Sequence, residues 1–145
     1  MALTVRQMAQ AVIDAIEGIS IPGTDTPEGK ADRFDVFRGV IGFEPVESED
    51  RAFAVLPGLA VRNLIVTDMS EYRVPMVIQT VYQMTPEVWD RIQYDAIVMA
   101  DTLHDLPAAN ASILDIRLEP GTVQPGPVDN TLLAQMTIEV VWDWS

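Results

Sequence analysis

The chain has 145 residues, of which nine are Lys or Arg and 22 are Asp or Glu, so its formal net charge is −13. One domain spanning residues 1–145 is expected at this length, and because 48% of the residues are hydrophobic, the charge does not indicate disorder. The shortage of positive charge argues against binding to nucleic acid or to an anionic membrane surface. The complete lack of Cys excludes disulfides, thiolate zinc sites and cysteine nucleophiles.

The first element expected in chain order is a helix over residues 4–18. Thr4 and Gln7 have the spacing of a capping box, apolar residues then recur at helical spacing, and Gly18 is placed to end the helix. Asp14 and Glu17 interrupt the apolar run, so we expect no signal peptide. No segment approaches the roughly 18 apolar residues of a membrane span, and a single domain in the cytoplasm is the simplest interpretation.

A polar stretch with two Pro and two Gly follows and predicts an exposed loop at about residues 20–32. Strand-like runs come next, and the strongest is Arg73 to Gln83, whose apolar residues on both faces are typical of a central strand. The other runs in this region are Phe34 to Phe43, Arg51 to Leu56 and Ala60 to Thr67.

A second helix is expected over residues 86–106, with Thr85 as its cap, Pro86 in its first turn and Pro107 as its end. Its apolar stripe should consist of residues at three- and four-residue steps, namely Trp89, Ile92, Ala96, Met99, Leu103 and Leu106.

The remainder of the chain predicts two strands joined by a loop. Ser112 to Glu119 alternates, with Leu114, Ile116 and Leu118 on one face, and Thr131 to Trp144 alternates most regularly of all. Three Pro and two Gly between them predict an exposed loop at about residues 120–130. The expected fold class is therefore α+β, a sandwich in which two helices pack on a mixed, mainly antiparallel sheet of about five to six strands.

Candidate sites for chemistry are few. The segment Gly23 to Ala31 resembles a phosphate-binding loop, but five residues separate its glycines and Ala31 has no hydroxyl, so we reject this interpretation. His104 is the only histidine. Asp101 and His104 share a helix face, where a weak divalent-cation site competes with a solvated polar face, and so few ligands favour the second.

Other motifs of catalysis are also missing from the sequence. The acidic run from Glu44 to Asp50 lacks calcium-loop spacing and is expected to be a solvated turn. No nucleophile elbow or dinucleotide fingerprint occurs, so we expect no enzyme activity, no metal and no cofactor. A pair of carboxylates that meets only in the fold stays an open alternative.

Two features indicate association with other proteins. Eight of the nine basic residues are Arg, which is enriched at protein interfaces, although codon bias explains this equally well. Trp142 and Trp144 close an alternating strand, where they either finish the core or anchor an interface. The candidate interface residues are Arg33, Arg38, Arg51, Arg62, Arg73, Trp142 and Trp144.

The whole layout resembles the tail terminator, or tail-completion, proteins of long-tailed bacteriophages. The resemblance rests on the opening helix, the exposed loop after it, the run from Arg73 to Tyr82 that leads into the helix from Pro86 to Leu106, and the long strand from Leu132 to Trp142. It covers nearly the entire chain and depends on the order and length of the elements, because no single motif is diagnostic of the family.

The resemblance implies a structural virion protein without catalysis, assembled in the host cytoplasm and placed in the tail at the neck junction. Such subunits form a homohexameric ring that caps the head-proximal end of the tail tube and contacts both the major tail-tube protein and a neck or head-completion protein. The genome passes through the channel without sequence-specific binding. Loops that would contact neighbours are, by position, residues 20–32, 67–72 and 120–130.

Three other functions compete with this one. A head-completion or neck connector subunit is the nearest alternative. A small α+β ligand-binding domain or enzyme would need a concave site with convergent polar groups. An adaptor would pair its edge strands with partners.

Overall fold

The computed structural model describes residues 3–19, 35–36, 52–62, 71–126 and 129–143. The loop expected at residues 20–32, most of the strand expected at residues 34–43 and the acidic run at residues 44–50 lie outside this description. The helices and strands are, in chain order, α1 (Val5–Glu17), β1 (Asp35–Val36), β2 (Ala52–Pro57), β3 (Val61–Arg62), β4 (Glu71–Gln83), α2 (Val88–His104), α3 (Leu106–Ala109), β5 (Ile113–Pro125) and β6 (Thr131–Asp143).

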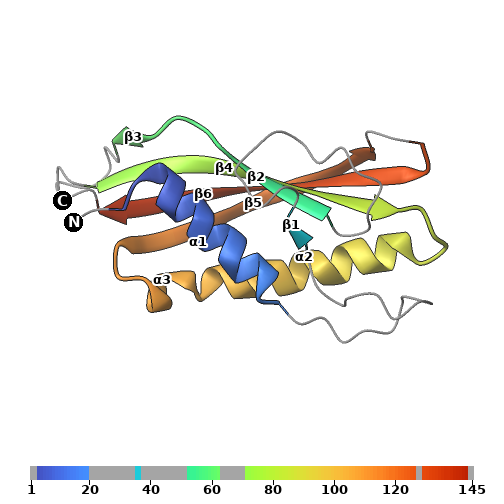
Figure 1. Cartoon of the computed structure of the whole chain (residues 1–145), viewed down its shortest axis with the longest axis horizontal. Coiled ribbons are helices and arrows are strands. Elements are labelled where there is room, and N and C mark those ends of the chain that lie inside the picture. Colours follow the sequence, from blue (N-terminus) through green and yellow to red (C-terminus); the bar gives the residue numbers. More distant parts are fainter. Residues whose placement is uncertain (1–2, 20–34, 37–51, 63–70, 127–128, 144–145) are drawn as a thin grey trace.

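The strands form one sheet in the order β1-β2-β4-β6-β5, with β3 paired to β4. The four strands of six or more residues, β2, β4, β6 and β5, pair with one another in antiparallel fashion, whereas β1 pairs with β2 in parallel over two residues. The two long helices lie against this sheet (Figure 1). The α+β class and the antiparallel character of the sheet are therefore confirmed. The expected total of five to six strands is not, because β1 and β3 have only two residues each.

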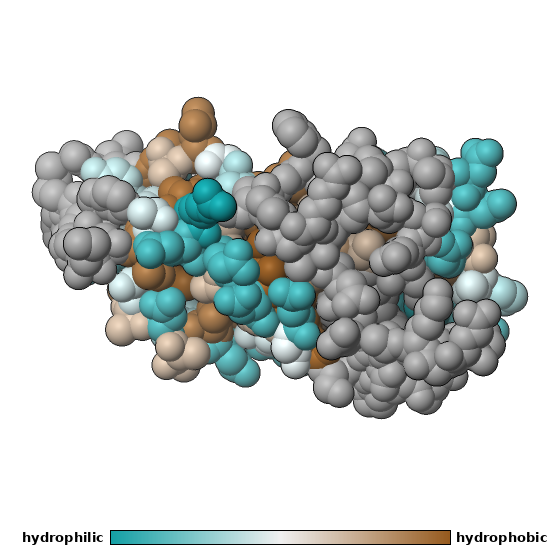
Figure 2. Space-filling view, viewed as in Figure 1, coloured by the Kyte–Doolittle hydropathy of each residue, from teal (hydrophilic) through white to brown (hydrophobic). Residues whose placement is uncertain are grey.

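Helix α1 begins as the sequence predicts. The Thr4 hydroxyl accepts a hydrogen bond from the Gln7 backbone N–H (3.1 Å), and the Gln7 side chain accepts one from the Thr4 N–H (2.8 Å). At the other end the Gly18 N–H donates to the Asp14 carbonyl (3.0 Å). The inward stripe of the helix is fully buried, and hydrophilic residues run along its outer side (Figure 2). The buried residues are Met8, Ala9, Val12, Ile13 and Ile16.

The centre of the sheet is the antiparallel pair β4 and β6, which are matched over 13 residue pairs. Alternation along β6 turns Ile138, Val140 and Trp142 toward the helices, opposite Met76, Val74 and Tyr72. Strand β4 lies between β2 and β6, which confirms its expected central place. It begins at Glu71, so the last two residues of the loop expected at residues 67–72 belong to the strand.

Helix α2 occupies its expected position but differs in detail. Glu87 is its N-cap, whereas Thr85 accepts a turn hydrogen bond from the Val88 N–H (3.1 Å). The helix ends at His104, and Pro107 lies in the first turn of the short helix α3. The expected cap at Thr85 and the expected end at Pro107 are therefore wrong, since a turn precedes α2 and a second helix follows it.

The apolar stripe of α2 is also rotated from the predicted one. The buried residues are Val88, Ile92, Asp95, Met99 and Leu103, while Trp89 is 54% exposed. Val88 is the first helical residue, and steps of four and three from Val88 bring Asp95 to the inside. The prediction that Trp89 packs in the core is therefore wrong.

Strand β5 is longer than expected and continues through Pro125, so most of the loop predicted at residues 120–130 is strand. Register shifts between Ile113 and Asp115 and between Glu119 and Thr122 interrupt its alternation. The first shift buries Ile113 and leaves Leu114 42% exposed, which contradicts the predicted apolar face. The chain then reverses near Asn130, which has a positive φ of 63°.

Candidate functional site

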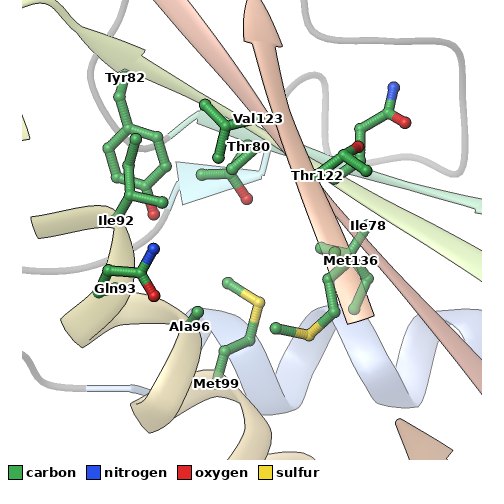
Figure 3. Close-up of a pocket in the computed structure, with 13 residues that line it drawn as sticks. Ile78, Thr80, Tyr82, Ile92, Gln93, Ala96, Met99, Thr122, Val123 and Met136 are labelled. Carbon is green, nitrogen blue, oxygen red and sulfur yellow. The ribbon is translucent and has the colours of Figure 1, made fainter. Parts of the chain in front are cut away.

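A cavity of about 160 Å³ lies between α2 and the half of the sheet that includes the second register shift of β5 (Figure 3). Helix α2 forms one wall, and β4, β6 and β5 form the other walls. The cavity is lined by Ile78, Thr80, Tyr82, Ile92, Gln93, Ala96, Met99, Gly121, Thr122, Val123, Ala134, Gln135 and Met136.

The shape of this cavity follows from the local sequence. At Gly121 the backbone approaches β6 so closely that a Cβ would lie 2.3 Å from the Gln135 carbonyl oxygen. Only glycine fits this position without moving the backbone, so the irregular stretch of β5 stays against β6. On the opposite wall Ala96 is small. Small residues on both walls leave a space that Met99 and Met136, with their flexible side chains, line without filling.

Polar groups stand at several points around the cavity. Figure 3 shows Gln93 and Met99 on the α2 side of the cavity, with Thr80 across the space from Met99. Tyr82, which is 2% exposed, donates a hydrogen bond from its hydroxyl to Asp95 Oδ2 (2.9 Å). Asp95 is fully buried, and this bond ties α2 to the central strand. The arrangement can hold an apolar group of about the size of benzene together with a hydrogen-bonding atom.

Titratable chemistry at the cavity is limited to Tyr82 among the lining residues. Sequence reasoning did not identify this site. The only sequence signal for it was Asp95, a carboxylate at the helical spacing of the buried residues of α2. Its hydrogen-bond partner Tyr82 lies on a different element, so the sequence does not show that the two meet.

Of the seven predicted interface residues, the structure describes the side chains of two. Arg33, Arg38, Arg51 and Trp144 lie outside the described residues, and of Arg62 only its place in β3 is described. Arg73 and Trp142 remain, and they lie in different environments.

Arg73 belongs to a row of charged side chains that crosses three strands. Its Nη1 lies 3.8 Å from Glu139 Oε1 on β6, and Arg117 Nη1 on β5 lies 3.6 Å from the same oxygen. Arg117 Nε in turn contacts Asp115 Oδ2 at 3.3 Å. Because these groups are partly exposed, the pairs contribute little to stability. They occupy the face of the sheet opposite the helices, since Glu139 and Arg117 alternate with the core residues Ile138 and Ile116.

Trp142 is 2% exposed and packs in the core shared by both helices and the sheet. Its ring centroid lies 5.8 Å from that of Tyr72, with the rings tilted by 44°. This placement favours the core alternative for Trp142, because a buried ring in the single chain presents no surface to a partner.

The pair considered for metal binding, Asp101 and His104, lies on the exposed side of α2. In the part of the chain that the structure describes, no three His, Asp or Glu residues are grouped as metal ligands. Among those same residues, no helix is long and apolar enough to cross a membrane.

Five of the large apolar side chains that the described chain exposes belong to α2 and β5. On α2 they are Trp89, Tyr94 and Ile97, with exposed fractions of 54%, 46% and 62%. On β5 they are Leu114 and Leu118, with 42% and 40%. The sequence pattern assigned Trp89, Leu114 and Leu118 to the interior, so their exposure became visible only in the fold.

The comparison with known proteins does not identify the chain: no protein-family model and no curated protein matches its sequence.

Proposed function

We propose that this chain is the subunit of a homohexameric ring that caps the head-proximal end of a bacteriophage tail tube. The ring would end polymerisation of the tube protein and join the tail to the neck. This makes the chain a structural protein of the virion, and the proposal assigns it no catalytic residue. The observation that carries the proposal is the long edge strand β5, together with the apolar side chains it exposes.

Strand β5 has 13 residues and, within the described chain, pairs on one side only, with β6. An edge strand offers backbone N–H and C=O groups to another chain, and proteins that remain monomeric protect such edges. Here Pro120 and Pro125 limit the pairing that β5 can accept, while Leu114 and Leu118 add apolar contacts. These features support a specific neighbour for β5.

A ring requires that the edge of one subunit meets a different surface of the next. Such a heterologous contact closes into a ring when the rotation that relates one subunit to the next is a whole fraction of a full turn. A closed ring of this kind has two unlike faces. One face would match the tube end and its major tail-tube protein, and the other would match a neck or head-completion protein.

The net charge of −13 fits this role. A basic channel would make phosphate contacts that hold DNA, whereas an acidic channel repels the phosphate backbone and lets the genome pass without sequence-specific binding.

Negative-stain imaging of the protein mixed with tail tubes tests the proposal. We expect rings at one end of each tube, and mass photometry should show hexamers or a monomer–ring equilibrium. Leu118→Lys on the β5 edge should shift the equilibrium toward monomer, whereas Gln10→Lys on the polar side of α1 should leave it unchanged. Uncapped tubes, with monomer at every concentration, would refute the terminator function.

The same experiment distinguishes the nearest alternative, a head-completion or neck connector subunit. Such a protein would bind filled heads and leave tail tubes uncapped. A gene position beside the major tail-tube gene would favour the terminator over the connector.

The cavity beside α2 supports a second candidate function, a small ligand-binding domain. Its apolar walls with a few polar groups at the border are typical of small-molecule sites, although its volume of about 160 Å³ is below their usual range. A thermal-shift screen of small aromatic compounds tests this function, because a specific ligand raises stability by mass action. Ala96→Met should fill the cavity and abolish any shift, and a shift that survives this substitution would place the ligand elsewhere.

A further inference from the structure

The outward side of α2 carries a continuous stripe of exposed residues that lies outside the core of the described chain. Asp90, Tyr94, Ile97, Asp101 and Asp105 follow one another at steps of four, three, four and four residues. Residues at these steps lie on one face of a helix, and all five are exposed. The buried stripe that starts at Val88 lies on the opposite side.

The middle of this stripe is apolar. Ile97 is 62% exposed and Tyr94 is 46% exposed, and they lie in neighbouring turns. A single exposed apolar residue is ordinary on a protein surface. Tyr94 and Ile97 lie three residues apart on one stripe, so together they form one small exposed apolar patch.

Both ends of the stripe are acidic. Asp90 lies before the apolar pair, while Asp101 and Asp105 lie after it, and the exposed N-cap Glu87 adds a further carboxylate at the start of the helix. The stripe contains no Lys or Arg. An apolar centre with carboxylates at both ends complements a surface that has an apolar centre and positive charges around it.

We propose that this α2 stripe (Asp90, Tyr94, Ile97, Asp101 and Asp105) docks a protein partner that presents an apolar patch flanked by Lys or Arg. Charge argues against the other occupants. A second copy carries a net charge of −13 itself, which opposes its approach to the carboxylates of the stripe. DNA and an anionic membrane are repelled by the same carboxylates. The inference rests on α2 alone and does not depend on the ring proposed above.

Peptide probes and matched variants test the proposal. The first probe is a synthetic helical peptide with Leu along one side and Lys and Arg on both flanks. The second has the same composition in scrambled order, so its charge is equal but its apolar stripe is lost. Isothermal titration calorimetry measures binding of each peptide to the full chain, and we expect the first to bind at least about tenfold more tightly, which corresponds to about 1.4 kcal/mol.

Variants of the chain distinguish binding at the α2 stripe from general attraction of a basic peptide to the net negative charge. Asp101→Lys with Asp105→Lys should weaken binding of the first peptide by about tenfold or more, because close charge pairs are lost. Asp14→Lys with Glu17→Lys makes the same charge change at the exposed end of α1 and should weaken binding by less than about twofold. Ile97→Gln, which keeps all charges, should also weaken it, and circular dichroism should show all variants folded.

Several results would overturn the proposal. Equal binding of the two peptides, or equal loss from the α1 and α2 charge reversals, would show that only net charge matters. No binding of the first peptide at low salt would also contradict it. If Ile97→Gln instead reduced self-association in sedimentation experiments, the occupant would be a second copy.

Discussion

Helices α1 and α2 lie against the same core, yet their outward sides differ in kind. Both bury a stripe of mainly apolar side chains, and Met8, Ile13 and Ile16 of α1 share one cluster with Met99 and Leu103 of α2. The exposed positions of α1 between Arg6 and Glu17 are all polar, whereas α2 exposes Trp89, Tyr94 and Ile97. Packing against the core explains the inner sides of both helices. The polar outer side of α1 is that of a face in contact with water, whereas contact with water does not explain the apolar residues on the outer side of α2.

The largest expected effect tests whether the inner sides are equivalent. Ile13→Ala on α1 and Leu103→Ala on α2 each remove a fully buried side chain and should lower the free energy of unfolding by about 2–5 kcal/mol. Urea denaturation measures both, and Gln10→Ala on the exposed side of α1 is the control, with a change within about 0.5 kcal/mol. A negligible loss for either buried variant would mean that its helix does not share the core.

The second prediction concerns a difference inside the core. Only α2 presents a buried carboxyl group to the sheet, and Tyr82→Phe removes the hydrogen bond that the phenol donates to Asp95. We expect a loss of about 1–3 kcal/mol in the free energy of unfolding, because the buried carboxyl group loses a partner. Tyr94→Phe changes an exposed phenol on the same helix and should have almost no effect. Similar losses from both would assign the effect to general packing.

The third prediction compares how the helices begin. Thr4→Ala removes the capping box of α1 and should lower the free energy of unfolding by about 1 kcal/mol. Glu87 makes no side-chain capping hydrogen bond at α2, so Glu87→Ala should cost at most about 0.5 kcal/mol, which is the interaction of its charge with the helix dipole. Thermal unfolding of both variants measures the difference, and the reverse order would contradict the observed cap geometry.

The smallest effect on stability is expected on the outer side of α2. Ile97→Gln should change the free energy of unfolding by less than about 0.5 kcal/mol, because the side chain is 62% exposed and fills no core position. Chemical denaturation measures this change. A loss as large as that of Leu103→Ala would show that Ile97 is part of the core and would remove the difference between the two helices.

Local patterns in the sequence determined several parts of the fold. The capping box of Thr4 and Gln7 predicts where α1 begins, and the alternation of apolar and polar residues predicts the strand β6. The α+β class followed because helical and strand periods are properties of short segments. The absence of cysteine and the net charge of −13 also belong to the sequence alone.

Tertiary structure decided the remainder. Pairing with β6 extended β5 through residues that local Pro and Gly content predicts as a loop, and its register shifts turned Leu114 outward. Contact with the sheet selected the stripe of α2 that begins at Val88, which exposed Trp89. The cavity and the Tyr82–Asp95 hydrogen bond need residues from separate elements to meet. A sequence records the period of each element, but which side of the element is buried depends on neighbours that are distant in the chain.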